Sequence, residues 1–516
     1  MPDIVLIFEV HQPYRLNMAF RHKLNEVISK GKDFAPDDLE RMYFDEELNK
    51  IIFQRVASRC YEPATTLFLK LLDEYSEFRV SFSFSGVLLE QAERWARDTL
   101  DLFKHIANHN RCEILGQTYY HSLAFMLGDD EFIDQVEEHR KTVRDLLGVW
   151  PKVFENTELI YDNHLAKLAA KLEFNAVVTE GSEKLLGWRS PNYVYRAKGV
   201  DIKVLFRNYR LSDDVGFRFT SRDWNQYPLT AAKYSSWLAS TSGQVICVFM
   251  DYETIGEHFP LETGIFEFFE WLPREVIKWG LSFATPSEVI SRYEPVDYID
   301  VVDPVSWADL ERDISAWVGN PMQVLALARE GALELPAKVS GSPTFLRLWR
   351  LLTISDHYYY MSMKGGGPGE VHSYFSPYPS PFNAFTAFND VLSDLERRVF
   401  EAIGVNLFES PWVKSVSRDR VFQFYESNGV PLPYVARNGL DLLGYIKSVP
   451  AKSLEYHVEH GHLAEWVRWV LGIKELAASI EKLRGLKGNE LRSRLVEELT
   501  ASFMKTTDLQ KRRVHT

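Results

Sequence analysis

Two acidic residues stand at the ends of apolar, strand-like runs. Glu158 lies near the end of PKVFENTEL, and Asp251 closes QVICVFMD. A carboxylate at the mouth of a buried strand costs free energy unless it is paired or used in a reaction. His11, in LIFEVHQP, ends a third run in the same way. This pattern predicts paired-carboxyl chemistry. Hydrolysis of a glycosidic bond is the leading case, because it needs one carboxylate as nucleophile and one carboxylic acid as proton donor.

A structural role competes with the catalytic one for Glu158. Asn156 or Thr157 would cap a helix that begins there, and an acid in a first helical turn is favourable. Asp251 is harder to explain structurally, because it is followed within eight residues by Glu253, Glu257 and His258. Such a cluster after an apolar strand is typical of a functional site.

The elements that position these residues alternate along the first part of the chain. Up to about residue 290, short apolar runs are separated by helix-like stretches such as 63–75, 86–108 and 131–147. This alternation indicates a parallel sheet covered by helices, and seven or eight such units indicate a barrel. Barrel active sites form at the C-terminal strand ends. Polar residues follow the runs at His11, Ser85, Gln117, Glu158, Glu180, Asn208, Asp251 and Thr285.

From about residue 300 the spacing of apolar residues becomes helical. We therefore expect three domains: a barrel over 1–295, a helical domain over 296–405 that completes the substrate cleft, and an all-helical C-terminal domain over 406–516. The glycine- and proline-rich stretch KGGGPGEVHSYFSPYPSPF is long enough to be functional, and we predict that it moves over a bound chain.

Composition narrows the function classes. The chain has 516 residues and a net charge of −13, which disfavours a nucleic-acid partner. Aromatic residues make up 14%, and aromatic faces stack on sugar rings, although most of them must form the core. Three cysteines suit a reduced, cytoplasmic setting. We expect the N-terminal run to be a strand rather than a signal peptide, and we expect no membrane span.

Metal binding is a rival chemistry. His11, His121 and His258 could join the acids in a histidine–carboxylate site. The sequence lacks tight ligand spacings such as HxxxH or HExxH, so we predict neither a catalytic metal nor a cofactor.

Five motifs, taken in order, resemble the sequence regions of glycoside hydrolase family 57. They are HQP at 11–13, EILGQTYYHSL, ENTELIYDN, MDYETIGEH and TISDHYYYM. The likeness covers roughly residues 1–400 and is closest to the intracellular archaeal α-amylase-type members. It implies a distorted barrel of seven β/α units, a helical bundle after it, and a retaining mechanism on α-glucans. The segment at about 415–500 is similar to a small helical domain of unknown function.

The resemblance also assigns roles residue by residue. The glutamate nucleophile of the family falls on Glu158 and its acid/base aspartate on Asp251. His11 matches a histidine of the sugar site, and Asp356 matches an acid that contacts substrate from the helical domain. The further candidates for substrate binding are Gln12, His121, Glu257, His258, Trp307 and His357.

We therefore predict a retaining α-amylase-type enzyme that acts on α-1,4-glucans or maltooligosaccharides. Two alternatives share this site: 4-α-glucanotransferase activity and branching activity, because a second sugar competes with water for one intermediate. Two others belong to different classes: a metal-dependent deacetylase or mannosidase, and a glucan-binding protein without catalysis. The retained carboxyl pair argues against the last.

Overall fold

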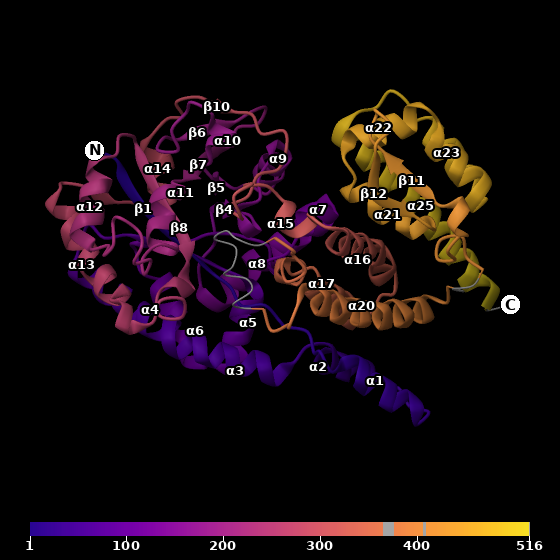
Figure 1. Cartoon of the computed structure of the whole chain (residues 1–516), viewed down its shortest axis with the longest axis horizontal. Coiled ribbons are helices and arrows are strands. Elements are labelled where there is room, and N and C mark those ends of the chain that lie inside the picture. Colours follow the sequence, from indigo (N-terminus) through magenta and orange to yellow (C-terminus); the bar gives the residue numbers. More distant parts are fainter. Residues whose placement is uncertain (365–375, 406–408, 515–516) are drawn as a thin grey trace.

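The computed structural model describes residues 1–364, 376–405 and 409–514. Figure 1 shows a sheet wrapped by helices at the N-terminal end, a group of long helices beside it, and a separate C-terminal unit at the far end. Most of the glycine-rich stretch, residues 365–375, lies outside the described residues, and so does its predicted movement.

Seven parallel strands form the barrel. Pairing runs from β1 through β2 to β3 on one side, and from β1 through β8, β7 and β5 to β4 on the other. A single bridge between Gly116 and Phe154 joins the two ends of this series. The strands are β1 Asp3–Val10, β2 Val80–Phe84, β3 Cys112–Ile114, β4 Val153–Glu155, β5 Ala176–Glu180, β7 Lys203–Arg207 and β8 Val245–Asp251.

The barrel is distorted, as the family resemblance implied. Strand β6 (Tyr195–Ala197) pairs antiparallel with the first half of β7, so only the tip of β7 reaches β8. That contact is the pair Arg207 and Cys247. The short strands β9 (Ser282–Phe283) and β10 (Tyr298–Ile299) add to β1 and β6 outside the ring.

Strand alternation sorts side chains between the barrel interior and its helical cover. In β1, Ile4, Leu6 and Phe8 pack outward against helices, whereas Val5 and Ile7 point into the barrel. All eight residues of β1 are buried, as expected for a parallel strand covered on both faces.

The helices that cover the barrel include the three stretches expected from sequence. They appear as α4 (Glu62–Glu74), α5 with α6 (Gly86–Trp95 and Arg97–Ala107) and α8 (Asp129–Leu147). The expected continuous helix over 86–108 is broken at Ala96, where φ is −153°. Further cover comes from α3 (Glu46–Val56), α9 (Asn163–Lys171), α11 (Tyr209–Gly216), α12 (Ala231–Ser240), α13 (Ile265–Lys278) and α14 (Pro286–Arg292).

The group of long helices has its own apolar core. Leu327, Trp349, Leu352 and Phe388 are fully or almost fully buried in it. Its helices are α15 (Ser315–Val318), α16 (Pro321–Val339), α17 (Pro343–Leu352), α18 (Ser355–Tyr359) and α20 (Pro381–Ile403). The early helices α1 (Phe20–Ser29) and α2 (Leu39–Tyr43) contribute residues to the same core.

The C-terminal unit is not all-helical, so that prediction was wrong. A hairpin of β11 (Phe422–Tyr425) and β12 (Pro431–Ala436) opens it. The segment ESNG between two alternating runs turns the chain, with Gly429 at φ +86°. Helices follow: α21 (Gly439–Ser448), α22 (Ala451–Glu459), α23 (His462–Trp466), α24 (Lys474–Glu481) and α25 (Gly488–Val514).

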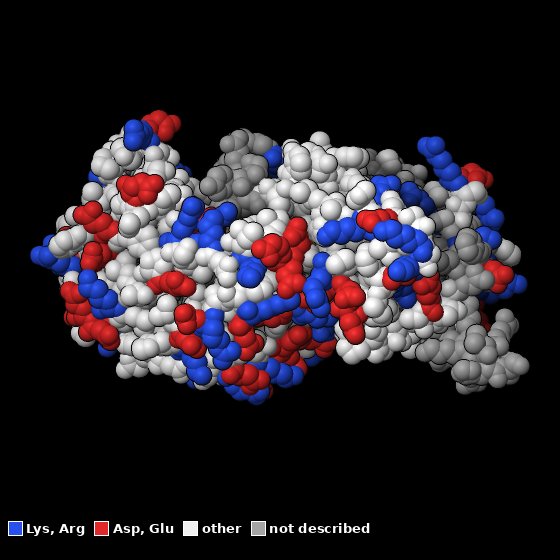
Figure 2. Space-filling model, turned by 90° about the horizontal axis from the view of Figure 1, so that it is seen from below, with Lys and Arg blue, Asp and Glu red and all other residues white. Residues whose placement is uncertain are grey.

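On the face shown in Figure 2, acidic and basic side chains are interspersed. Among the described helices, none has both the length and the apolar character that a membrane span requires.

Candidate active site

A cleft lies where the C-terminal strand ends of the barrel meet the helical region. Glu158, Asp251 and His11 line it from the barrel, and Trp307 and Asp356 line it from the segment that follows. Every candidate residue from the sequence lines this cleft except His357. The remaining candidates on its wall are Gln12, His121, Glu257 and His258.

Glu158 is held by groups from distant parts of the chain. Trp307 donates its indole Nε1–H to Oε2 of Glu158 at 2.7 Å, and Ser355 donates its hydroxyl to Oε1 at 3.3 Å. Glu158 has φ 60° and ψ 23°, a left-handed conformation that is costly for a residue with a side chain. It lies in a three-residue 3₁₀ turn, and Asn156 makes no capping hydrogen bond there. Glu158 is therefore not a helix N-terminal acid.

Asp251 ends β8 in a different electrostatic environment. Burial, and then the negative charge of Glu158, raise the pKa of Asp251 to about 7. Glu257, which follows Asp251 closely in sequence, forms ion pairs with Arg55 at 2.8 Å and Arg59 at 3.6 Å. The chief like charge on Asp251 comes from Glu158, so the two acids differ in the way that acid–base catalysis requires.

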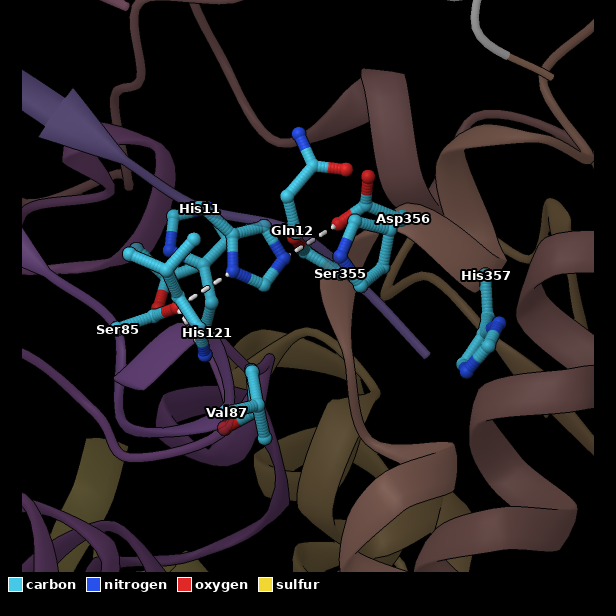
Figure 3. Close-up of polar contacts among 12 residues, drawn as sticks. His11, Gln12, Ser85, Val87, His121, Ser355, Asp356 and His357 are labelled. Carbon is cyan, nitrogen blue, oxygen red and sulfur yellow. Dashed lines mark hydrogen bonds and ion pairs between the residues drawn. The ribbon is translucent and has the colours of Figure 1, made fainter. Parts of the chain in front are cut away.

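His11 connects the barrel to the helical region. Its Nδ1 lies 2.7 Å from Ser85 Oγ, and its Nε2 lies 3.1 Å from Asp356 Oδ2 (Figure 3). Burial, and then the charge of His121, lower the pKa of His11 to about 4, so the ring is neutral. Although burial opposes it, the hydrogen bond from His11 lowers the pKa of Asp356, which is therefore ionised. Asp356 thus forms part of the cleft wall.

His121 stacks on His11, with ring centroids 4.1 Å apart. Its Nδ1 lies 2.9 Å from Gln117 Oε1, and its Nε2 lies 3.6 Å from Glu158 Oε1. The backbone of His121 has φ 48°, a second strained position beside the cleft. Gln12 is also buried, and its Oε1 accepts a hydrogen bond of 3.1 Å from Arg15.

His357 does not line the cleft, which corrects its prediction as a substrate-binding residue. It is 2% exposed, and its Nε2 donates to the carbonyl of Leu351 at 3.1 Å. Its ring packs near Phe44 and Phe388, and Figure 3 shows it apart from the other labelled side chains. One residue along a helix turns the side-chain direction by about 100°, so Asp356 faces the cleft and His357 faces the helical core.

A buried charge network supports Trp307, and the sequence analysis missed most of it. Arg207 donates to Glu180 at 3.0 Å and also to Asp213. Arg312 donates to Asp213 at 3.1 Å and to the carbonyl of Trp307. The Arg207 guanidinium lies 5.4 Å from the Trp307 ring centroid. An arginine closing the apolar run VDIKVLFRN was the available signal, because such a charge needs partners.

Among the described residues, no group of three or more His, Cys, Asp or Glu side chains has an arrangement that holds a metal ion.

Comparison with known proteins identifies the family. The model of Glycosyl hydrolase family 57 matches residues 5–302. The chain is also 44% identical over 419 residues to a protein of Methanocaldococcus jannaschii named "Putative alpha-amylase", an alignment that covers 79% of this chain and 86% of that protein. The chain belongs to glycosyl hydrolase family 57. The family predicted from the motifs is confirmed.

Other family 57 proteins resemble the chain more distantly. The 4-alpha-glucanotransferase of Thermococcus litoralis is 25% identical over 263 residues, which cover 47% of this chain and 36% of that protein. Its crystal structure superposes with a TM-score of 0.54 at 17% identity, over 82% of this chain and 63% of that chain. The family 57 branching enzyme of Thermococcus kodakaraensis superposes with a TM-score of 0.53 at 12% identity, over 78% of this chain and 90% of that chain. At these identities the likeness establishes the fold.

Beneath the family 57 cleft of this chain lies a layer of buried polar side chains that was not predicted from the sequence. Glu9 in β1 pairs in register with Ser83 in β2 and with Asp251 in β8. Glu155 in β4 reaches the same layer and is completely buried. The alternation of β1 was the signal, because Glu9 shares the inward-facing parity of Val5 and Ile7.

Proposed function

We propose that this family 57 chain is a retaining glycoside hydrolase that cleaves α-1,4-glucosidic bonds of α-glucans by double displacement. One observation carries the proposal: Glu158 and Asp251 line the same cleft, in environments that favour a carboxylate at Glu158 and a protonated acid at Asp251. Trp307 and Ser355 donate hydrogen bonds to Glu158, which suit a carboxylate. Burial raises the pKa of Asp251 to about 7, which suits a proton donor.

The reaction then follows two balanced steps. Glu158 attacks the anomeric carbon while Asp251 gives its proton to the departing glycosidic oxygen, which leaves a glycosyl ester on Glu158. Asp251, now ionised, takes a proton from water as the water oxygen attacks the same carbon. The ester bond breaks, Glu158 regains its charge, and the sugar keeps its original anomeric configuration.

Transfer is the second candidate function. A sugar hydroxyl can replace water in the second step, because the ester does not depend on the acceptor. The names of relatives favour this candidate, since they include a 4-alpha-glucanotransferase and a branching enzyme.

We also propose the domain division 1–295, 296–405 and 406–516. Apolar cores centred on the barrel, on the long helices and on the C-terminal unit support it. A reducing, cytoplasmic location is proposed as well, and the three free cysteines support it.

Product analysis tests the function. Purified protein is incubated with maltoheptaose and with amylose, and the products are separated. Proton NMR determines the anomeric configuration of the newly formed products. Shorter α-anomeric products support retaining hydrolysis, longer chains support transfer, and new α-1,6 linkages support branching. Initial β-anomers, or turnover that persists in Glu158→Gln, contradict the mechanism.

A further inference from the structure

Two buried glutamates face each other beneath the cleft. Glu9 is 4% exposed and Glu155 is completely buried, and their carboxyl groups lie within hydrogen-bonding reach of each other. Ser83 donates its hydroxyl to Oε1 of Glu155 at 2.7 Å. Oε2 of Glu155 is buried and has no conventional donor among the described residues. A proton held between the two carboxyls would supply that donor and would relieve the repulsion of two adjacent charges.

Gln117 links the glutamate pair to His121 through hydrogen bonds. Its Nε2 donates to Glu9 Oε1 at 2.9 Å and to Ser83 Oγ at 2.8 Å, so both amide hydrogens are used. The amide oxygen can only accept, and it lies 2.9 Å from Nδ1 of His121. Nδ1 of His121 must therefore carry a hydrogen.

The other ring nitrogen of His121 faces a carboxylate. Nε2 lies 3.6 Å from Oε1 of Glu158, and an unprotonated nitrogen there would direct its lone pair at a negative oxygen. The favourable state has hydrogens on both nitrogens, which makes His121 an imidazolium. Its stacked neighbour His11 is then the neutral ring of the pair.

We propose that Glu9 and Glu155 share one proton and one negative charge, and that this charge, acting through Gln117, keeps His121 an imidazolium directed at Glu158. Glu9 and Glu155 are positioning residues in this scheme. The inference rests on the proposed role of Glu158 as nucleophile. When Glu158 becomes an ester its charge disappears, and the glutamate pair then keeps His121 charged until the carboxylate returns.

The electrostatics of the surrounding groups agree with this geometry. Burial and the charge of Glu155 raise the pKa of Glu9 well above its usual range. Although burial opposes it, the hydrogen bond and charge of Glu158 raise the pKa of His121, and Glu155 adds to this. The ionisable groups around His121 are Glu9 on β1, His11 just after β1, Glu155 on β4, Glu158 on its turn, Asp251 on β8 and Asp356 on α18.

The test is an NMR titration of protein with labelled histidine side chains, without substrate. The His121 signal is assigned by its loss in His121→Asn. In Glu9→Gln or Glu155→Gln, the new amide replaces the shared proton and one charge remains, so the titration midpoint of His121 should stay close to that of wild type. The double variant has no charge, and the midpoint should fall by about one pH unit or more. Glu113→Gln is the matched control, because Glu113 is a half-buried glutamate on β3 that accepts a hydrogen bond from the Ser287 amide.

Two results would overturn the proposal: a single variant that lowers the midpoint as far as the double variant does, or a double variant that leaves it unchanged. If the double variant does not fold, Gln117→Leu keeps both carboxyls and removes the hydrogen-bonded link, leaving the direct contact of 3.5 Å between His121 Nδ1 and Glu9 Oε1. An unchanged His121 midpoint in this variant would also overturn the proposal, because the charge would then not act through Gln117. The kinetic readout is turnover of an aryl α-glucoside. On this substrate the kcat of the double variant should fall at least about tenfold, with little change in KM. Because the titration needs no substrate, a lack of glucan turnover would overturn the proposed function alone.

Discussion

The indole Nε1 of Trp307 donates a 2.7 Å hydrogen bond to Oε2 of Glu158, although 149 residues separate the two in sequence. The backbone repeats the contact, because the Trp307 amide donates to the Glu158 carbonyl at 3.3 Å. The segment that leaves the barrel thus returns over β4 and fixes the proposed nucleophile. The Trp307 ring is held in turn by Phe249, with the two ring centroids 5.4 Å apart.

Trp307→Phe should lower kcat/KM on maltooligosaccharides by about tenfold to a hundredfold, because a hydrogen bond to a charged group contributes about 1.5–3 kcal/mol. The phenyl ring keeps most of the packing against Phe249. Trp317→Phe is a suitable control, since the indole N–H of Trp317 is buried and has no partner among the described residues. Equal losses in both variants would show that packing, rather than the hydrogen bond to Glu158, is responsible.

The loss of activity in Asp251→Asn should depend on the leaving group of the substrate. Turnover of amylose should be almost abolished, whereas formation of the glycosyl-enzyme from an activated aryl glycoside should change far less, because that leaving group needs little proton assistance. In the wild-type protein, kcat/KM on amylose should fall as pH rises through about 7, where Asp251 loses its proton. A burst of released phenol measures the first step. Equal losses on both substrates would contradict the acid–base assignment.

The same substitution should stabilise the fold in a defined pH range. The folded-state pKa of Asp251 is raised from 3.8 to about 7, so the native state binds more protons than the unfolded state between these values. Stability contributed by this group therefore falls as pH rises through that window. Asp251→Asn should match wild type in Tm near pH 4 and exceed it at pH 8. Asp101→Asn, on the exposed face of α6, is the control and should show no such divergence.

Asp356 and His357 provide a paired test of the cleft wall. Asp356→Ala should lower kcat/KM by about tenfold or more while the Tm changes little, because it removes a carboxylate that lines the cleft and bonds His11. His357→Gln should instead lower the Tm and leave KM unchanged, because His357 packs in the helical core. Kinetics and thermal melts of the two variants distinguish these outcomes. Unchanged kinetics in Asp356→Ala would remove the helical region from the active site.

Local sequence patterns determined much of the architecture. Apolar runs separated by helical stretches predicted a parallel barrel, and the polar residues after those runs predicted the edge where the cleft lies. Asp251 was recognisable because a fully apolar strand ends on a charge, and its place at the end of β8 follows from that pattern. These features are properties of a few consecutive residues, so they can be read without knowing which segments become neighbours.

The tertiary structure decided the relationships between distant residues. Barrel closure at Gly116 and Phe154 brings Glu155 against Glu9, and no local pattern links positions so far apart. The orientation of α18 in the fold likewise decided that Asp356 faces the cleft and that His357 faces the helical core. Protonation states follow from such neighbours, because burial and nearby charge set a pKa while sequence position does not. The chain therefore specifies its candidate acids locally, and only the closed barrel and the helices packed on it decide which of them act together.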